Sequence, residues 1–195
     1  MEHPLIEEKT FDKIDFKNIP LTKGEYENCR FLNCDFSNVS LSDYKFADCT
    51  FSVCNLSLVK LTNTAFRNIV FTDCKMLGLH FDSCNPFGLS IRFENCIINH
   101  SSFYKKKIKK TIFKNCQLQE VDFTECDLTD SLFDNCDLTR ATFDHTILEK
   151  TDFCTSYNYS IDPEINRIKK AKFSIYRLSG LLEKYDLQFD NSWLS

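Results

Sequence analysis

The fold of this chain is decided by residues 113–138, which read FKNCQLQEVDFTECDLTDSLFDNCDL. A large apolar residue stands at every fifth position, and a small residue, most often Cys, stands two positions before it. The large apolar residues are Phe113, Leu118, Phe123, Leu128, Phe133 and Leu138. A helix would place its apolar residues about 3.6 positions apart, and a half-buried strand would place them about 2 apart. A period of five therefore predicts neither of these elements.

The same spacing extends outward in both directions, and we call the large apolar residues the centres of the repeat. The first series of centres is Phe11, Phe16, Leu21, Tyr26, Phe31, Phe36, Leu41, Phe46, Phe51, Leu56, Leu61, Phe66, Phe71, Met76 and Phe81. The second series is Phe93, Ile98, Phe103, Ile108, Phe113, Leu118, Phe123, Leu128, Phe133, Leu138, Phe143, Leu148 and Phe153. These positions hold 16 of the 19 Phe residues, so the repeat accounts for the unusual Phe content.

The two series are offset by two residues. Turn-forming residues between Asn85 and Ser90, which read Asn-Pro-Phe-Gly-Leu-Ser, are the natural place for this insertion. We expect a small bulge there, with Phe87 as an aromatic residue outside the repeat. An exposed Phe87 would be a candidate for partner binding, and a Phe87 folded back onto the repeat would be structural.

The cysteines follow the same period. Ten of the eleven lie two residues before a centre position, and only Cys154 does not. Such regular spacing favours small inward-facing packing residues over a zinc site, whose ligands would cluster with His at short spacing. We expect reduced thiols, no metal and no cofactor.

The pattern of a small residue, any residue, then a large apolar residue strongly resembles the pentapeptide-repeat family over roughly residues 11–155. The resemblance implies an all-β fold, a right-handed quadrilateral β-helix in which four pentapeptides make one square coil. Every fourth centre would then share a face, and the first face would carry a column of eight Phe. The expected organisation is an N-terminal cap segment over residues 1–10, a solenoid over 11–155 and a last irregular coil, helix and short strand over 156–195.

The tail after Phe153 departs from the repeat. Ala171-Lys172-Phe173 recovers a repeat, and Ser174 can cap a helix of about Ile175–Tyr185, with a short strand over Leu187–Phe189 after it. The apolar residues of this tail are Ile175, Leu178, Leu181, Leu182, Tyr185, Leu187 and Phe189. The helix would plug the last coil, and it would either serve as a cap alone or also hold two copies together.

The tail, residues 171–187, and the segment 158–167 before it resemble those of the Qnr, albicidin-resistance and microcin B17-immunity proteins, which belong to the pentapeptide-repeat family. This resemblance implies a homodimer joined through the C-terminal element. It also implies a rod that mimics duplex DNA, engages DNA gyrase or topoisomerase IV, and protects that enzyme from an inhibitor. A quinolone, an albicidin-like compound and a microcin-like peptide all remain open, as does the absence of any inhibitor.

The charge pattern is compatible with DNA mimicry. Residues 120–152 hold ten acids and two bases, a net charge of −8, although the whole chain carries only −4. Stacking of equivalent positions on successive coils would pair some of these acids with bases. The expected neighbours are Lys110 and Lys150 with Asp130, Lys114 with Asp134, Glu120 with Arg140, Lys105 with Glu125, and Lys107 with Asp127. The acids left without a basic neighbour, and so the predicted partner-binding residues, are Asp122, Asp137, Asp144, Glu149 and Asp152. A solvated, self-paired surface is the alternative.

The lysine run over residues 105–110 could contact nucleic acid. It lacks interleaved aromatic residues, and the chain lacks a fold that reads bases. We therefore expect no direct nucleic-acid binding.

No catalytic centre is predicted, because the chain has no GxSxG, HExxH or phosphate-binding Gly loop and its four His are dispersed. No signal peptide or membrane span is evident, so a cytoplasmic location is expected. The alternative to topoisomerase protection is a scaffold or regulatory adaptor that binds another protein through one face of the solenoid.

Overall fold

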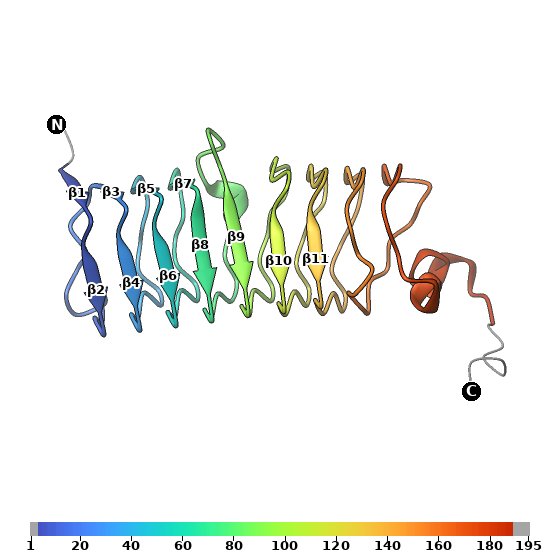
Figure 1. The fold of residues 1–195 in the computed structure, drawn as a ribbon, viewed down its shortest axis with the longest axis horizontal. Helices are drawn as coiled ribbons and strands as arrows, with labels where there is room; N and C mark the ends of the chain where they lie inside the picture. The colour runs from blue at the N-terminus through green and yellow to red at the C-terminus, as the bar shows by residue number, and fades with distance from the viewer. Residues whose placement is uncertain (1–3, 189–195) are drawn as a thin grey trace.

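The computed structural model describes residues 4–188 and shows a rod of stacked coils, with β1 at one end of the rod and the C-terminal helical segment at the other (Figure 1). The strands are β1 Leu5–Glu7, β2 Thr10–Asp12, β3 Glu25–Glu27, β4 Arg30–Leu32, β5 Lys45–Ala47, β6 Thr50–Ser52, β7 Ala65–Arg67, β8 Ile69–Thr72, β9 Ile91–Glu94, β10 Ile112–Lys114 and β11 Leu132–Asp134. Three short 3-10 helices are η1 Phe81–Ser83, η2 Ile175–Leu181 and η3 Glu183–Tyr185.

All strand pairs are parallel, and most join positions that are four pentapeptides apart, as in the pair Phe31 and Phe51. One sheet has the order β1-β3-β5-β7, and the other has the order β11-β10-β9-β8-β6-β4-β2. Isolated parallel bridges with the same spacing, such as Asp35 with Asn55 and Ser40 with Lys60, form the other two sides. Each coil thus consists of four pentapeptides, one on each side. The predicted quadrilateral β-helix is confirmed.

We number the four faces by their centres. The first face begins at Phe11, the second at Phe16, the third at Leu21 and the fourth at Tyr26. The fourth face also includes Ile6 of β1, which pairs with Tyr26. Between β8 and β9 the partner spacing increases by two residues, as in the pair Phe71 and Phe93. The two extra residues lie in the segment 85–90, which leaves the fourth face as a protruding loop (Figure 1).

The core contains an unbroken column of nine stacked Phe rings on the first face. Its members are Phe11, Phe31, Phe51, Phe71, Phe93, Phe113, Phe133, Phe153 and Phe173, with successive ring centroids 4.6–5.4 Å apart. Most of these rings have no exposed surface. Burying a Phe side chain contributes about 1.5–3 kcal/mol, so this column is a major part of the driving force for stacking.

The small residue before each centre also has a polar role. Thr64, Thr146 and Ser156 each donate a hydrogen bond to a backbone carbonyl of the preceding coil, at 2.7–2.9 Å. Cys74 and Cys136 place their thiols 3.3–3.4 Å from the equivalent carbonyls. A residue at this position must therefore be small, and a weak donor such as a thiol suits it.

The corner residue of most pentapeptides, two positions after the centre, has a left-handed backbone. Asn33, Asp48, Asn115 and many equivalent residues have φ between 51° and 62°. Asn and Asp tolerate this conformation better than other residues with side chains, which explains why they recur at the corners. The period of five thus reflects the backbone as well as the core.

The C-terminal helical segment differs from the regular helix expected over Ile175–Tyr185. It consists of two 3-10 pieces, and the first is interrupted at Arg177, where φ is −131°. Ser174 caps it as expected, because its side chain accepts a hydrogen bond from the Tyr176 amide. Gly180 lies so close to Tyr159 that a Cβ would clash with the Tyr159 carbonyl oxygen and ring. This close packing against the last coil stabilises the tight helical turns.

Leu187 and Gln188 adopt no regular secondary structure, and Phe189 lies outside the described residues. None of the helices within residues 4–188 has the length and apolar character needed to cross a bilayer.

Candidate partner-binding surfaces

The five predicted partner-binding acids are spread over all four faces. Asp122 and Asp144 flank the stacked centres Phe123 and Phe143, so they share the third face on adjacent coils. The other three lie elsewhere: Asp137 on the second face, Asp152 on the first face and Glu149 on the fourth face. Only Asp122 and Asp144 can therefore act together on one flat surface of a partner.

Two of these five acids have basic partners, contrary to the expectation from sequence. Glu149 accepts from Arg167 at 2.6 Å, and Asp152 pairs with Lys172 at 3.1 Å. Both bases come from the last coil, which follows the regular repeat. Lys172 lies directly above Asp152, whereas Arg167 stacks on Ile147 and reaches Glu149 along a diagonal.

Other ion pairs follow the expected columns only in part. Three predicted pairs form: Glu120 with Arg140, Glu125 with Lys105 and Asp130 with Lys150. The other three predicted pairs are wrong. Asp127 is bound by Lys109 and not by Lys107. Lys114 binds Glu94 and not Asp134, and Asp130 pairs with Lys150 and not with Lys110. Most of the pairs that form are exposed, so each contributes only about 0–1 kcal/mol.

Among the described residues, three acids of the 120–152 segment have no basic or histidine partner within ion-pair distance: Asp122, Asp134 and Asp137. Asp144 contacts Nδ1 of His145 at 2.7 Å. The acidic surface is thus partly self-neutralised, and its three unpaired acids lie on three different faces, with Asp122 on the third face beside Asp144.

Asp137 is held by neutral donors. It accepts from Gln119 Nε2 at 2.7 Å, from Thr139 Oγ1 at 2.6 Å and from Asn158 Nδ2 at 3.0 Å. Burial alone would raise the pKa of Asp137, but these hydrogen bonds outweigh it and hold the pKa below its usual value. Asp137 therefore stays ionised, although its lone pairs are largely used within the rod.

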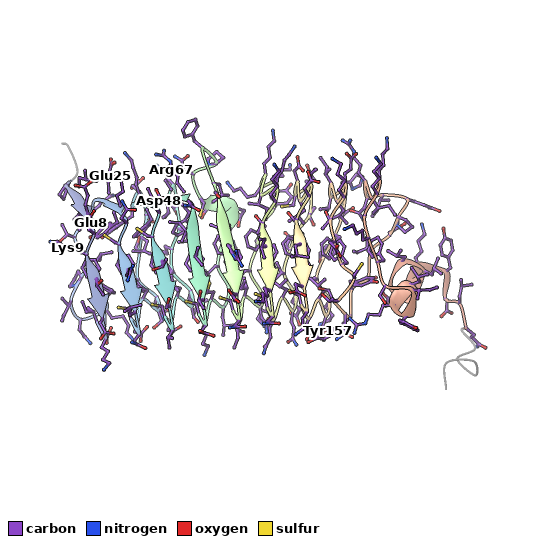
Figure 2. All side chains as sticks on the ribbon, viewed as in Figure 1. Glu8, Lys9, Glu25, Asp48, Arg67 and Tyr157 are labelled. Carbon is purple, nitrogen blue, oxygen red and sulfur yellow. The ribbon has the colours of Figure 1, made fainter. Side chains whose placement is uncertain are left out.

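The loop over residues 85–90 exposes its aromatic residue. Phe87 is 75% exposed, and the Arg67 guanidinium lies over its ring, 5.4 Å from the centroid. Figure 2 places Arg67 on the side of the rod where the loop protrudes. Phe87 does not fold back into the core, so the structural alternative considered for it does not apply.

The C-terminal segment carries five of the exposed large apolar residues of the described chain. Ile175 and Tyr176 are about three-quarters exposed, and Leu178, Tyr185 and Leu187 are also exposed. Leu181 and Leu182 are only half-exposed, and Leu181 packs against the core. Exposed apolar residues gathered at one end of a rod are typical of an interaction site.

A polar hollow of about 530 Å³ lies between the last coil and the C-terminal segment. Tyr157, labelled near this end in Figure 2, stacks with Arg177, whose guanidinium also donates to the carbonyl of Thr155 at 2.8 Å. Arg177 thus fastens the tail to the rod. No pattern in the sequence pointed to this role.

The cysteines are consistent with packing residues. Ten free cysteines are buried and Cys154 is exposed. Burial raises the pKa of Cys49 and of Cys84 to about 12, so both remain thiols near neutral pH. Within residues 4–188, no group of three or more His, Cys, Asp or Glu side chains is placed to hold a metal ion.

Comparison with known proteins gives a family match. The family model described as "Pentapeptide repeat region" matches residues 24–86 and 89–157. A search of curated proteins gave no match. Among solved structures, full-length QnrB1, a plasmid-mediated fluoroquinolone resistance protein, is 20% identical, with a TM-score of 0.45 over 94% of this chain and 100% of its own. HetL, involved in heterocyst differentiation regulation in Nostoc sp. strain PCC 7120, is 11% identical, with a TM-score of 0.40 over 88% of each chain.

Proposed function

This chain belongs to the pentapeptide-repeat family, and from that premise we propose that it is a non-catalytic protein that binds a type II DNA topoisomerase. The proposed target is DNA gyrase or topoisomerase IV. The acidic C-terminal coils would occupy the basic groove that normally holds duplex DNA, and the bound protein would protect the enzyme from an inhibitor such as a quinolone, an albicidin-like compound or a microcin-like peptide.

One observation carries the proposal: the acidic coils lie directly beside the exposed apolar end of the rod. Residues 120–152 carry a net charge of −8, and the apolar residues Ile175, Tyr176 and Leu178 follow one to three coils later. Two copies joined through these ends would place their acidic segments on both sides of the dimer centre. Such a field would steer the rod toward a basic groove.

The homodimer is part of this proposal. Its interface would consist of the exposed residues Ile175, Leu178, Tyr185 and Leu187, with Tyr176 beside them. Leu181 and Leu182 would mainly support this surface from below. The resemblance of the tail to those of the Qnr, albicidin-resistance and microcin B17-immunity proteins supports the same arrangement.

The target can be tested by gyrase and topoisomerase IV assays with the purified protein, with and without each class of inhibitor. The informative variant is Asp122→Lys with Asp144→Lys, because these acids share the third face. A matched control is Asp12→Lys with Asp48→Lys, which makes the same change of charge in the N-terminal half. We expect the first variant to lose its effect on the enzymes and the control to keep it.

A wild-type protein that leaves both enzymes unaffected at micromolar concentration would contradict the proposal. The adaptor alternative would then account better for the exposed loop and the flat faces. Equal loss in both variants would show that total charge, rather than the third face, governs binding.

The interface can be tested by Ile175→Asp with Leu178→Asp and light scattering. Because both side chains are exposed, we expect a folded monomer with an unchanged circular dichroism spectrum. A variant that keeps the mass of a dimer would contradict the interface.

A further inference from the structure

The loop over residues 85–90 stands above the lysine run of the next coil. Pro86, Phe87, Leu89, Lys105, Lys106 and Lys107 line a hollow of about 420 Å³ between them. One wall of this hollow is apolar and aromatic, and the other consists of lysine side chains. Residues from two different coils thus form one surface, which we call the loop–lysine surface.

The loop is held in place by polar contacts. Asn85 accepts a hydrogen bond from the Phe87 amide at 2.9 Å, and its own amide group donates to Asn63 at 2.9 Å. Lys106 is buried and donates through Nζ to the Cys84 carbonyl at 2.7 Å, directly before the loop. A loop fixed in this way keeps Phe87 exposed instead of letting it collapse onto the rod.

One cation covers the exposed ring, and further cations line the hollow beside it. Arg67 covers one side of Phe87, and Lys105 lies 4.8 Å from the ring centroid of Tyr104, a second partly exposed aromatic residue. Lys105 also pairs with Glu125 at 3.4 Å. Lys107 lines the hollow and has no ion-pair partner among residues 4–188, so its charge is available to a ligand.

We propose that the loop–lysine surface binds single-stranded nucleic acid, with a base stacked on Phe87 and the adjacent phosphates held by Arg67, Lys105 and Lys107. Sequence-tolerant binding of single strands combines an aromatic stacking platform with cations that follow the backbone. The Phe87 ring and these cations supply both. The interior of a paired duplex offers no free base face to Phe87, and a peptide of Asp and Glu offers no aromatic ring to stack on it.

This inference revises the expectation that nucleic acid is not bound. That expectation depended on the absence of aromatic residues within the lysine run and of a fold that reads bases. The loop supplies the missing aromatic residue from another coil, and the proposed contact is independent of the acidic third face and of topoisomerase binding.

The test is fluorescence anisotropy with a labelled fifteen-nucleotide oligothymidine, compared with its duplex with oligoadenine. We expect wild-type protein to bind the single strand with a Kd of about 1–100 µM. Phe87→Ala should weaken this binding about tenfold through loss of stacking. Lys105→Gln with Lys107→Gln should lower the slope of log K against log salt by about 1.4, as expected when two phosphate contacts on a single strand are lost.

The matched control is Lys169→Gln with Lys170→Gln, which removes the same charge from the fourth face farther along the rod. Neither lysine has an ion pair within the described residues, and we expect affinity and salt slope to stay unchanged. Thermal unfolding of every variant should match the wild type, because the altered side chains are exposed.

Several outcomes would overturn the proposal. These are no binding up to about 100 µM, an unchanged affinity of Phe87→Ala, equal losses in the control, or duplex binding as tight as single-strand binding. Competition by poly-glutamate as effective as competition by unlabelled oligothymidine would instead identify an acidic polypeptide as the ligand.

Discussion

The two halves of the rod lie on either side of the 85–90 loop. They share the aromatic column on the first face, but each half has its second aromatic column on a different face. The first-face Phe column runs through both. In the N-terminal half a second column, Tyr26, Phe46 and Phe66, occupies the adjacent fourth face and forms the four-stranded sheet. The second column of the C-terminal half is on the third face: it begins at Phe81, just before the loop, and continues through Phe103, Phe123 and Phe143.

The change of column coincides with the loop. Pro86 stands where the fourth face would have its next ring, and Pro cannot donate to a ladder hydrogen bond. The four-stranded sheet accordingly ends at β7. The first-face column continues past the loop without interruption, whereas the fourth face loses its ring at the point where the loop leaves it.

The largest expected effect concerns the shared column. Phe113 is fully buried between Phe93 and Phe133, at 5.2 and 4.7 Å. Phe113→Ala should lower the free energy of unfolding by about 3–5 kcal/mol, measured by denaturant titration. Phe11→Ala should cost clearly less, because Phe11 is only partly buried and stacks with the column on one side only. Equal costs would mean that the column does not act as a continuous stack.

The next effect concerns the packing of the C-terminal tail against the last coil. Gly180→Ala would force a methyl group against the Tyr159 carbonyl and ring. We expect a loss of about 1–3 kcal/mol, measured by thermal unfolding, with faster hydrogen exchange in the tail. Gly88→Ala is the comparison within the loop, where the nearest atoms lie 3.5 Å away but φ is +70°. A neutral Gly180→Ala would show that the tail can move away from the last coil.

A smaller effect concerns the acids of the C-terminal half. The pKa of Asp137 is lowered in the folded state. The contribution of this carboxylate to folding stability is therefore fully present above the unfolded pKa of about 3.9, and it is lost as pH falls through the folded pKa. Asp137→Asn should therefore lose less stability than the wild type between neutral pH and about pH 3. Denaturant titrations over this range measure the difference. Parallel pH profiles would show that Asp137 is not a source of acid sensitivity.

The smallest effect contrasts equivalent corners of the two halves. Val53 is β-branched, exposed and left-handed, with φ of 56°, whereas Asn115 fills the same corner column with φ of 53° and donates to Asn95. Val53→Asn should stabilise the rod by about 0.5–1 kcal/mol by relieving strain. Asn115→Val should destabilise it by at least as much. A loss of stability in Val53→Asn would indicate that the Val53 side chain has packing contacts worth more than the strain.

The sequence predicted the fold class correctly because the solenoid repeats one local rule. Each centre is buried by its own pentapeptide, so a period of five identifies inward residues without knowledge of distant contacts. The surface was harder to predict. Direct stacking on adjacent coils identified the Glu120–Arg140 pair. Lys109 and Arg167 instead reach acids beside their direct neighbours, because long side chains cross a face diagonally.

What the sequence by itself determined is which side chains face inward, since apolar residues at a fixed interval of five must be buried. The resemblance to pentapeptide repeats then implied the square coil and the Phe column. Beyond the three ion pairs that direct stacking predicted, only the tertiary structure decided which outward side chains meet. Phe87 lies under Arg67 and lines one hollow with Lys107 because the loop projects from one coil. Asp122 shares a face with Asp144, whereas Asp137 lies on another. These contacts depend on which side chains the path of the chain around the square brings together. A local sequence pattern does not specify this for flexible polar side chains.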